Sequence, residues 1–211
     1  MTETEYDITV VKSAGNLVGE SPLWNPIERA LYWVDTRRPA VQRLGPDGRY
    51  DVWKMPSRTT TIALRKAGGL IVGTQRGFGE LNTVTGEVKT IVDPDAATPN
   101  IRLNDGKIDR RGRYWCVSAD EEHSRGSLFR LDPDHSCHRM DTGFTLGNGL
   151  AFSPDGRTMI VGDTSAGLVY AYDFDLDAGQ ISNRRVFFSV QGEAWHTDGG
   201  TFDADGYYWC A

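Results

Sequence analysis

Short apolar runs alternate with polar turns along the whole chain, and the same succession of runs returns several times. One run, rich in aromatic and β-branched residues, begins at residues 31, 70, 114, 159 and 208. The repeat is therefore roughly 45 residues long, and further short apolar runs follow in most repeats. No segment has apolar positions at the helical interval over several turns. The pattern predicts short strands and no long helix.

Turn signals divide each repeat into hairpins. Pairs such as Asp155-Gly156 and Asp205-Gly206 suit tight turns, because Asp and Gly accept a positive φ. With the strand that precedes each turn, a repeat contains four strands, which is the size of a propeller blade. We therefore expect an all-β fold, a β-propeller, as one domain over residues 1–211. A β-sandwich is the alternative, but its strands would not recur in groups of four.

The repeats do not fill a closed ring. The chain contains four repeats and half of a fifth, and it ends inside a predicted strand that begins at Tyr208. A propeller closes into a ring because unpaired strand edges are costly. We therefore expect an incomplete propeller that lacks its C-terminal part, with completion by a second copy of the chain as the alternative.

Composition and charge exclude some classes of function. The 211 residues are 39% hydrophobic and 25% charged, as in a globular protein, and the net charge is −6. An acidic chain argues against binding to nucleic acid or to an acidic membrane surface, and no apolar run approaches a membrane span. The three cysteines have no metal-site spacing, so we expect a reduced, cytoplasmic protein. The sequence gives no indication of the oligomeric state.

Polar residues recur at one phase of the repeat, at the start of the first strand. They are Glu20, Thr60, Asn104, Asn148 and Asp198. In a propeller these positions lie around the central channel, where their oxygens would meet. Such a set suits one divalent cation, with Ca²⁺ as the simplest candidate and Zn²⁺, Mn²⁺ or Mg²⁺ as alternatives. Considered singly, Asn and Asp beside Gly are ordinary turn residues, and Glu20 is an ordinary surface residue.

Four segments resemble the senescence marker protein/regucalcin and gluconolactonase-like family. They are Gly19–Trp24, Arg102–Asp109 with Gly112–Trp115, Gly147–Gly156, and Asp198–Gly206 with Trp209. The resemblance extends over essentially the whole chain. It implies a six-bladed propeller, of which about four and a half blades are present. Thr197 departs from the family, which often has Pro before the Asp-Gly pair.

The same resemblance implies the residues of a metal site. The family binds one divalent metal ion through a Glu, an Asn and an Asp, which correspond to Glu20, Asn148 and Asp198. Asp198 is also the candidate general base that accepts a proton from the attacking water. Its role as a ligand competes with its role as a base, because a carboxylate bound to a cation is weakly basic.

Substrate contacts follow from the resemblance as well. Arg102 and Asn104 match the family's substrate-binding pair in the Arg-x-Asn-Asp-Gly segment. An acidic residue after the next strand also contributes, and the spacing favours Glu122 over Glu121. Guanidinium and amide groups offer fixed donors for hydroxyl groups or for a lactone oxygen.

We therefore expect a metal-dependent hydrolase that opens sugar lactones, gluconolactonase-like, with a small sugar lactone as its substrate. One alternative is a promiscuous lactonase or esterase that acts on less polar esters. Another is a non-catalytic propeller that binds calcium or a protein, since a fold alone does not decide function. A serine nucleophile elbow, a phosphate loop and a dinucleotide motif are all absent from the sequence.

Overall fold

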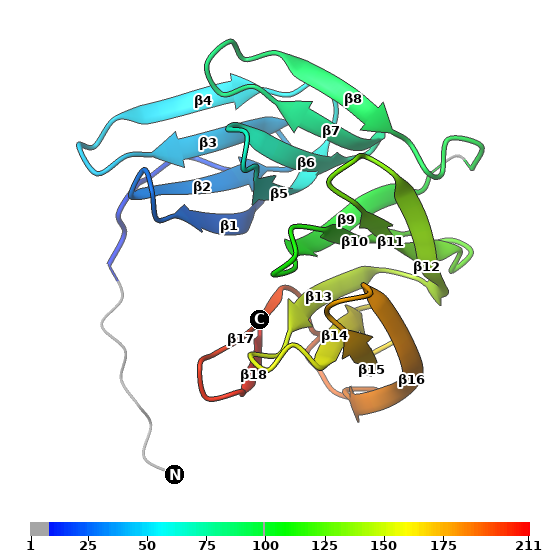
Figure 1. The fold of residues 1–211 in the computed structure, drawn as a ribbon. Helices are drawn as coiled ribbons and strands as arrows, with labels where there is room; N and C mark the ends of the chain where they lie inside the picture. Colours follow the sequence, from blue (N-terminus) through cyan, green and yellow to red (C-terminus); the bar gives the residue numbers. More distant parts are fainter. Residues whose placement is uncertain (1–8, 99) are drawn as a thin grey trace.

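A computed structural model describes residues 9–98 and 100–211. Within these residues the chain forms eighteen β-strands and no helix. The described part of the chain therefore contains no helix long and apolar enough to cross a membrane. The strands build four antiparallel sheets of four strands and one of two, which follow one another along an arc (Figure 1). The prediction of an all-β propeller is confirmed. Each sheet is called a blade below.

Each blade is a meander of consecutive strands, and its first strand is innermost. Blade 1 contains β1 (Gly19–Asn25), β2 (Ala30–Asp35), β3 (Ala40–Leu44) and β4 (Tyr50–Lys54). Blade 2 contains β5 (Thr59–Leu64), β6 (Leu70–Thr74), β7 (Gly77–Leu81) and β8 (Val88–Val92). Blade 3 contains β9 (Arg102–Ile108), β10 (Tyr114–Ala119), β11 (Gly126–Leu131) and β12 (Cys137–Phe144). Blade 4 contains β13 (Gly147–Phe152), β14 (Thr158–Asp163), β15 (Leu168–Asp175) and β16 (Gln180–Ser189), and the two-stranded sheet contains β17 (Gly200–Phe202) and β18 (Tyr208–Cys210).

The repeat found in the sequence corresponds to the second strand of each sheet. The five recurring runs lie in β2, β6, β10, β14 and β18. The outer strand β12 has no counterpart among the predicted runs, because its residues Cys137–Phe144 are mostly polar or small and largely exposed. Outer strands pack on one face only, so a buried period is weak in their sequences.

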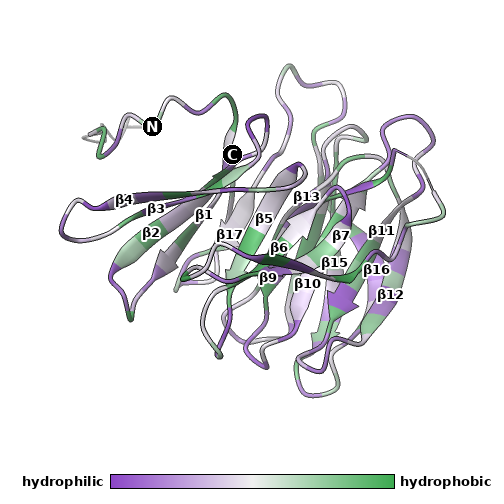
Figure 2. Ribbon diagram, turned by 90° about the horizontal axis from the view of Figure 1, so that it is seen from above, coloured by the Kyte–Doolittle hydropathy of each residue, from purple (hydrophilic) through white to green (hydrophobic). Residues whose placement is uncertain are grey.

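The core lies between neighbouring blades. Val34 of blade 1 packs with Ile62 and Val72 of blade 2, and Trp115 of blade 3 packs with Leu150 and Met159 of blade 4. Apolar residues are frequent on strands that face another blade, and hydrophilic residues are frequent on the loops (Figure 2). Burial of apolar area between blades is therefore the main force that holds the arc together.

Side chains on the inner strands also join the blades by hydrogen bonds to the backbone. Thr60 Oγ1 of β5 donates to the Leu103 carbonyl of β9 at 2.9 Å. Asn104 Nδ2 of β9 donates to the Gly147 carbonyl of β13, also at 2.9 Å. The Tyr208 hydroxyl of β18 donates to the Gly149 carbonyl at 2.8 Å. These bonds fix β5 against β9 and β9 against β13, and they attach β18 to β13.

The hairpin between β9 and β10 is held by a buried ion pair. The Asp109 carboxylate is fully buried and accepts hydrogen bonds from Arg113 Nε at 2.6 Å and from Trp115 Nε1 at 2.9 Å. Arg113 also donates to the Leu176 carbonyl in the loop that follows β15. One carboxylate thereby orients a turn, a core tryptophan and the contact between blades 3 and 4.

Substitution of this carboxylate tests that assignment. Asp109→Ala is expected to lower the free energy of unfolding by about 3–5 kcal/mol, because the buried Arg113 charge loses its partner. The measurement is urea unfolding of the full chain, followed by tryptophan fluorescence. The control is Asp155→Ala in the corresponding turn of blade 4, where the carboxylate accepts bonds from Ser153 and Arg157 at an exposed position. Equal losses in the two variants would contradict the role given to Asp109.

Candidate functional site

The candidate residues come from several blades and lie on one face of the arc, where the inner strands begin. This face is called the site end below. The strand register places these starts beside the ends of the second strands: Gly19 pairs with Asp35, Arg102 with Ala119, and Gly147 with Asp163. The loops that leave β2, β10 and β14 therefore reach the same end. Glu20, Arg102, Asn104 and Asn148 lie near the starts of β1, β9 and β13, and Asp198 comes directly before β17.

Each of the four long inner strands has a β-bulge at this end. The pairing register shifts between Glu20 and Leu23 in β1, between Thr59 and Thr61 in β5, and between Asn148 and Ala151 in β13. In β9 the shift leaves Asn104 without a direct partner on β10. A bulge turns side chains away from the regular alternation and is frequent beside functional sites. Four of the polar residues found at one phase of the repeat thus lie at or next to bulges: Glu20, Thr60, Asn104 and Asn148.

Two aspartates anchor the loops of the site end. Asp35 accepts hydrogen bonds from the backbone N–H groups of Leu17 and Val18, before β1, and of Arg37 and Arg38, after β2. Burial alone would raise the pKa of Asp35, but these four donors outweigh it and lower the pKa below its usual value. In blade 4 the Asp163 carboxylate accepts bonds from Thr145, Leu146 and Ala166 in the same way. The backbone of these loops is therefore held in place.

Three carboxylates gather at the site end from three different sheets. Burial raises the pKa of Glu20, and the negative charges of Asp198 and Asp105 raise it further, while Arg58 lowers it. Both Asp105 oxygens accept backbone hydrogen bonds, from Gly106 at 2.8 Å and from Leu150 at 2.9 Å. Asp105 therefore joins β9 to β13, whereas Glu20 and Asp198 make no side-chain hydrogen bond within the described residues. Carboxylates that repel one another in this way are relieved by a cation.

The amide of Asn148 has a fixed orientation. Its Nδ2 donates to Thr164 Oγ1 at 3.1 Å, and the Thr164 hydroxyl donates in turn to the Thr197 carbonyl at 2.7 Å. Because the hydroxyl proton is used on Thr197, Thr164 Oγ1 accepts from Asn148, and the Asn148 nitrogen must face it. The amide oxygen of Asn148 then points away from Thr164, and it makes no hydrogen bond within the described residues.

Two glycines allow the backbone to pack tightly around Asn148. A Cβ on Gly147 would overlap the Val117 side chain. Gly149 has φ +60°, and a Cβ there would overlap the Tyr208 hydroxyl and lie 2.9 Å from the Asp198 carbonyl oxygen. The Gly-Asn-Gly sequence is therefore part of a bulged strand in close contact with the next sheet, not of a hairpin turn. It brings Asn148 and Asp198 onto adjacent segments.

The predicted substrate-binding residues belong to blade 3. Arg102 begins β9, its side chain is 13% exposed, and Nη2 donates to Glu121 Oε1 at 3.3 Å. The Glu122 carboxylate lies 3.8 Å from His123 Nδ1 on the exposed loop after β10. The Asn104 amide donates one N–H to Gly147, which leaves its second N–H and its oxygen for other contacts.

The structure adds residues that the sequence did not single out. Asp105 contributes negative charge beside Glu20, and Arg58 contributes positive charge. Thr164 orients Asn148 through its hydroxyl group. Asp105 belongs to the Arg-x-Asn-Asp-Gly segment but was given no role of its own. Arg58 and Thr164 show no motif in the sequence.

The donor set at the site end suits a hard cation. It contains the carboxylates of Glu20 and Asp198 and the amide oxygen of Asn148, all acceptors without a hydrogen-bond donor in the described part of the chain. Oxygen ligands of this kind are preferred by Ca²⁺ and Mg²⁺. Across residues 9–98 and 100–211, no cluster of three or more His, Cys, Asp and Glu side chains has the geometry of a metal site. The candidate set differs from such a cluster in combining two carboxylates with one amide.

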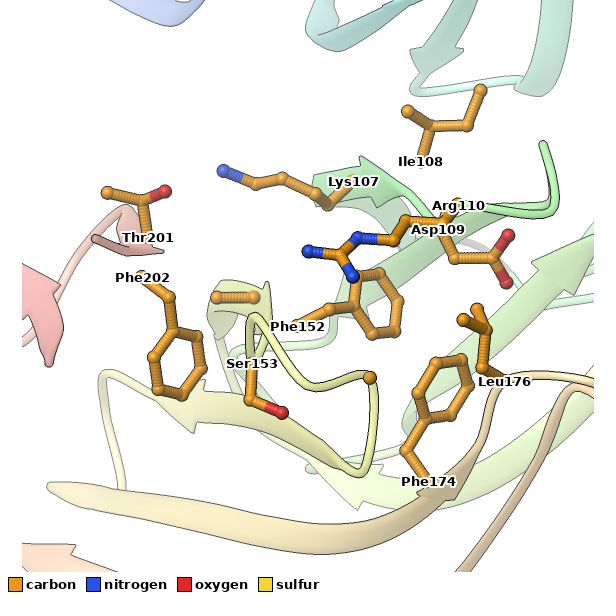
Figure 3. Close-up of a pocket in the computed structure, with 12 residues that line it drawn as sticks. Lys107, Ile108, Asp109, Arg110, Phe152, Ser153, Phe174, Leu176, Thr201 and Phe202 are labelled. Carbon is orange, nitrogen blue, oxygen red and sulfur yellow. The ribbon is translucent and has the colours of Figure 1, made fainter. Parts of the chain in front are cut away.

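A cavity of about 170 Å³ lies at the other end of the blades, away from these residues. Lys107, Arg110, Phe152, Phe174 and Phe202 are among its lining residues (Figure 3). Ile108 and Phe152, which also line it, are at the ends of β9 and β13 opposite to the site end. Lys107 Nζ donates to the Gly200 carbonyl beside this cavity, so it joins blade 3 to β17. The cavity contains none of the predicted site residues.

The chain is similar to known proteins in sequence and in fold. Residues 18–211 match the family described as SMP-30/Gluconolactonase/LRE-like region, and the chain belongs to this family. Regucalcin from Xenopus laevis is 34% identical over 97% of this chain and 71% of its own length. The 6-deoxy-6-sulfogluconolactonase of Pseudomonas putida is 32% identical over 93% of this chain and 68% of its own. A solved luciferin-regenerating enzyme superposes with a TM-score of 0.85 at 29% identity, over 93% of this chain and 69% of that one.

The hydrogen bond that orients Asn148 leads to a test. Thr164→Val keeps the shape of the side chain but removes the acceptor that holds the amide nitrogen. Affinity for a divalent cation is expected to fall about 10- to 100-fold, as is typical when a group that orients a ligand is lost. Calorimetric titration with Ca²⁺ measures this, and Thr158→Val at the far end of β14 is the control. An unchanged affinity in Thr164→Val would show that Asn148 does not bind the cation.

Proposed function

We propose that this protein is a metal-dependent hydrolase that opens sugar lactones. The observation that carries the proposal is the proximity of Glu20, in β1, and Asp198, before β17. The two carboxylates are close enough for the charge of Asp198 to raise the pKa of Glu20. Asn148 lies on the segment next to Asp198, with its amide oxygen free. The relative from Pseudomonas putida is named as a lactonase, which supports this class of reaction.

Glu20, Asn148 and Asp198 would hold one divalent ion, for which Ca²⁺ is the first candidate. A bound ion of this kind would polarise the carbonyl of the lactone and make water beside it more acidic. Arg102 and Asn104, from blade 3, supply donors for the hydroxyl groups of the substrate. Glu121 pairs with Arg102 and fixes its guanidinium, and Glu122 lies on the same loop.

The reaction is an addition of water followed by ring opening. Asp198 accepts a proton from the water, whose oxygen forms a bond to the carbonyl carbon. The bond between that carbon and the ring oxygen then breaks, and the proton passes to the ring oxygen. The product is an open-chain hydroxy acid, and the overall change is the addition of one water molecule.

A non-catalytic calcium-binding propeller is the second candidate. It is supported by the similarity to regucalcin, whose name denotes no hydrolytic reaction. The same oxygen donors would serve both functions. The two candidates differ in the role of Arg102, because a cation site alone has no need of a largely buried guanidinium group beside it.

A panel of lactones separates the two candidates. The full chain with a divalent ion is expected to hydrolyse sugar lactones, and a chelator is expected to abolish the activity, which returning the ion restores. The release of acid in weakly buffered solution is the measurement, corrected for spontaneous hydrolysis. If no lactone is hydrolysed with Ca²⁺, Zn²⁺, Mn²⁺ or Mg²⁺, while Ca²⁺ binds, the binding function is correct instead.

Paired substitutions test the roles of the residues. Asp198→Asn keeps one oxygen ligand but removes the base, so turnover at saturating metal is expected to fall by at least about 100-fold. Arg102→Ala is expected to weaken lactone hydrolysis while metal affinity stays nearly unchanged, because its guanidinium contacts the substrate. Metal affinity and kcat are measured for both variants. Full activity of Asp198→Asn with metal bound would refute the assignment of the base.

A further inference from the structure

Three arginines lie at the site end, one on each of the first three blades. Arg37 is in the loop after β2, Arg58 directly precedes β5, and Arg102 begins β9. Backbone hydrogen bonds hold the first two in place: Arg37 N donates to Asp35, and the Arg58 carbonyl accepts from Gln75 N at 2.8 Å. The three guanidinium groups therefore extend from fixed positions on consecutive blades.

These positive charges act on one another. Burial lowers the pKa of Arg102, the charge of Arg58 lowers it further, and Arg37 contributes in the same direction, while Glu121 opposes them. Within the described residues, Glu121 is the one carboxylate that forms an ion pair with any of the three, and its side chain is 60% exposed. One exposed carboxylate does not balance three guanidinium groups that repel each other.

Two donors in this cluster have no partner. Arg58 Nε and Arg102 Nε are buried and make no hydrogen bond in the described part of the chain. A buried N–H of a charged group is costly when it is unpaired. Arg58 does not form an ion pair with any carboxylate there either. The missing partners point to a ligand that brings acceptor atoms and negative charge.

The arginine cluster adjoins the cation-binding residues. Arg58 directly precedes β5, and Ser21 Oγ, in the residue after Glu20, donates to Thr61 Oγ1 of β5 at 3.4 Å. Arg102 is two residues from Asn104 in β9. A lactone with its carbonyl at Glu20, Asn148 and Asp198 would extend its remaining substituents toward the arginines. Hydroxyl groups would satisfy single donors, but they would not offset the repulsion of three guanidinium charges. An anionic group does both, and guanidinium pairs with such groups through two parallel hydrogen bonds.

We propose that Arg37, Arg58 and Arg102 form a subsite for an anionic substituent, so that the substrate is a lactone bearing a phosphate, sulfonate or carboxylate group. This inference rests on the proposed lactonase function and specifies its substrate class. The subsite binds the substituent, and the bond that breaks remains the ring ester at the other side of the site.

The test compares gluconolactone with two derivatives that carry a phosphate or a sulfonate at the terminal carbon. The charged lactones are expected to have a kcat/KM about 10- to 100-fold above that of the neutral one at low ionic strength, which corresponds to charge-assisted hydrogen bonds. The advantage is expected to shrink as salt is added, because salt screens the charges. A preference for one derivative identifies which anion the subsite fits.

Substitutions of single arginines show which of them cause the preference for charged lactones. Arg58→Gln and Arg37→Gln are each expected to reduce the ratio of charged to neutral kcat/KM, by about 10-fold for the more buried Arg58. Arg58→Lys is expected to restore part of the ratio, because the charge remains while the planar group is lost. The control is Arg38→Gln, since Arg38 is an exposed neighbour in the same loop and donates to the Gly15 carbonyl. Its ratio is expected to match that of the parent protein.

The outcomes separate the inference from the proposed function. If the neutral lactone is hydrolysed as well as or better than the charged ones, the subsite is wrong and the lactonase function stands. A ratio that falls equally in Arg38→Gln and Arg58→Gln also overturns the subsite, because the effect would be general electrostatics. If no lactone of either kind is hydrolysed, the proposed function itself fails.

Discussion

Hydrogen bonds between inner strands set the geometry on which the rest of this structure depends. The bonds from Thr60 to Leu103 and from Asn104 to Gly147 each join positions about one repeat apart. Asp105 adds a third joint, because it accepts the Leu150 N–H of the next blade. These bonds lie among the residues of the candidate site. The positions of the polar side chains at the site end are thus determined by the joints between blades.

Groups of like charge lie close together at the site end, and their repulsion is unfavourable for the folded chain. Glu20, Asp105 and Asp198 are close enough to influence one another, and Arg58 and Arg37 both act on Arg102. Like charges that are partly withdrawn from water raise the free energy of the folded chain. The two proposed ligands would offset these charges: a cation would neutralise the carboxylates, and an anionic substituent would neutralise the arginines.

The sequence predicted the blades because the second strand of each four-stranded sheet is largely buried on both faces and is mostly apolar. Glu20, Asn148 and Asp198 were predicted as metal ligands from their common phase and the family resemblance. The outer strand β12 was missed, since one exposed face dilutes its apolar residues. Bulges at Asn104 and Asn148 were missed because register is a property of paired strands. Arg37 and Arg58 carry no local motif, since only the docking of blades brings them beside Arg102.

The bulges affect how the sequences of such proteins can evolve. A residue in a bulge has no direct partner on the neighbouring strand, so its replacement leaves the pairing of the regular strand unaltered. The apolar core between blades is built by other residues, such as Val34 and Trp115. Thr60 and Asn104 also hold the joints between blades. Glu20, beside the bulge of β1, makes no side-chain hydrogen bond within the described residues, so its mutation alters the lining of the channel with little effect on folding. This separation lets one scaffold diversify its ligands while its framework is inherited almost intact.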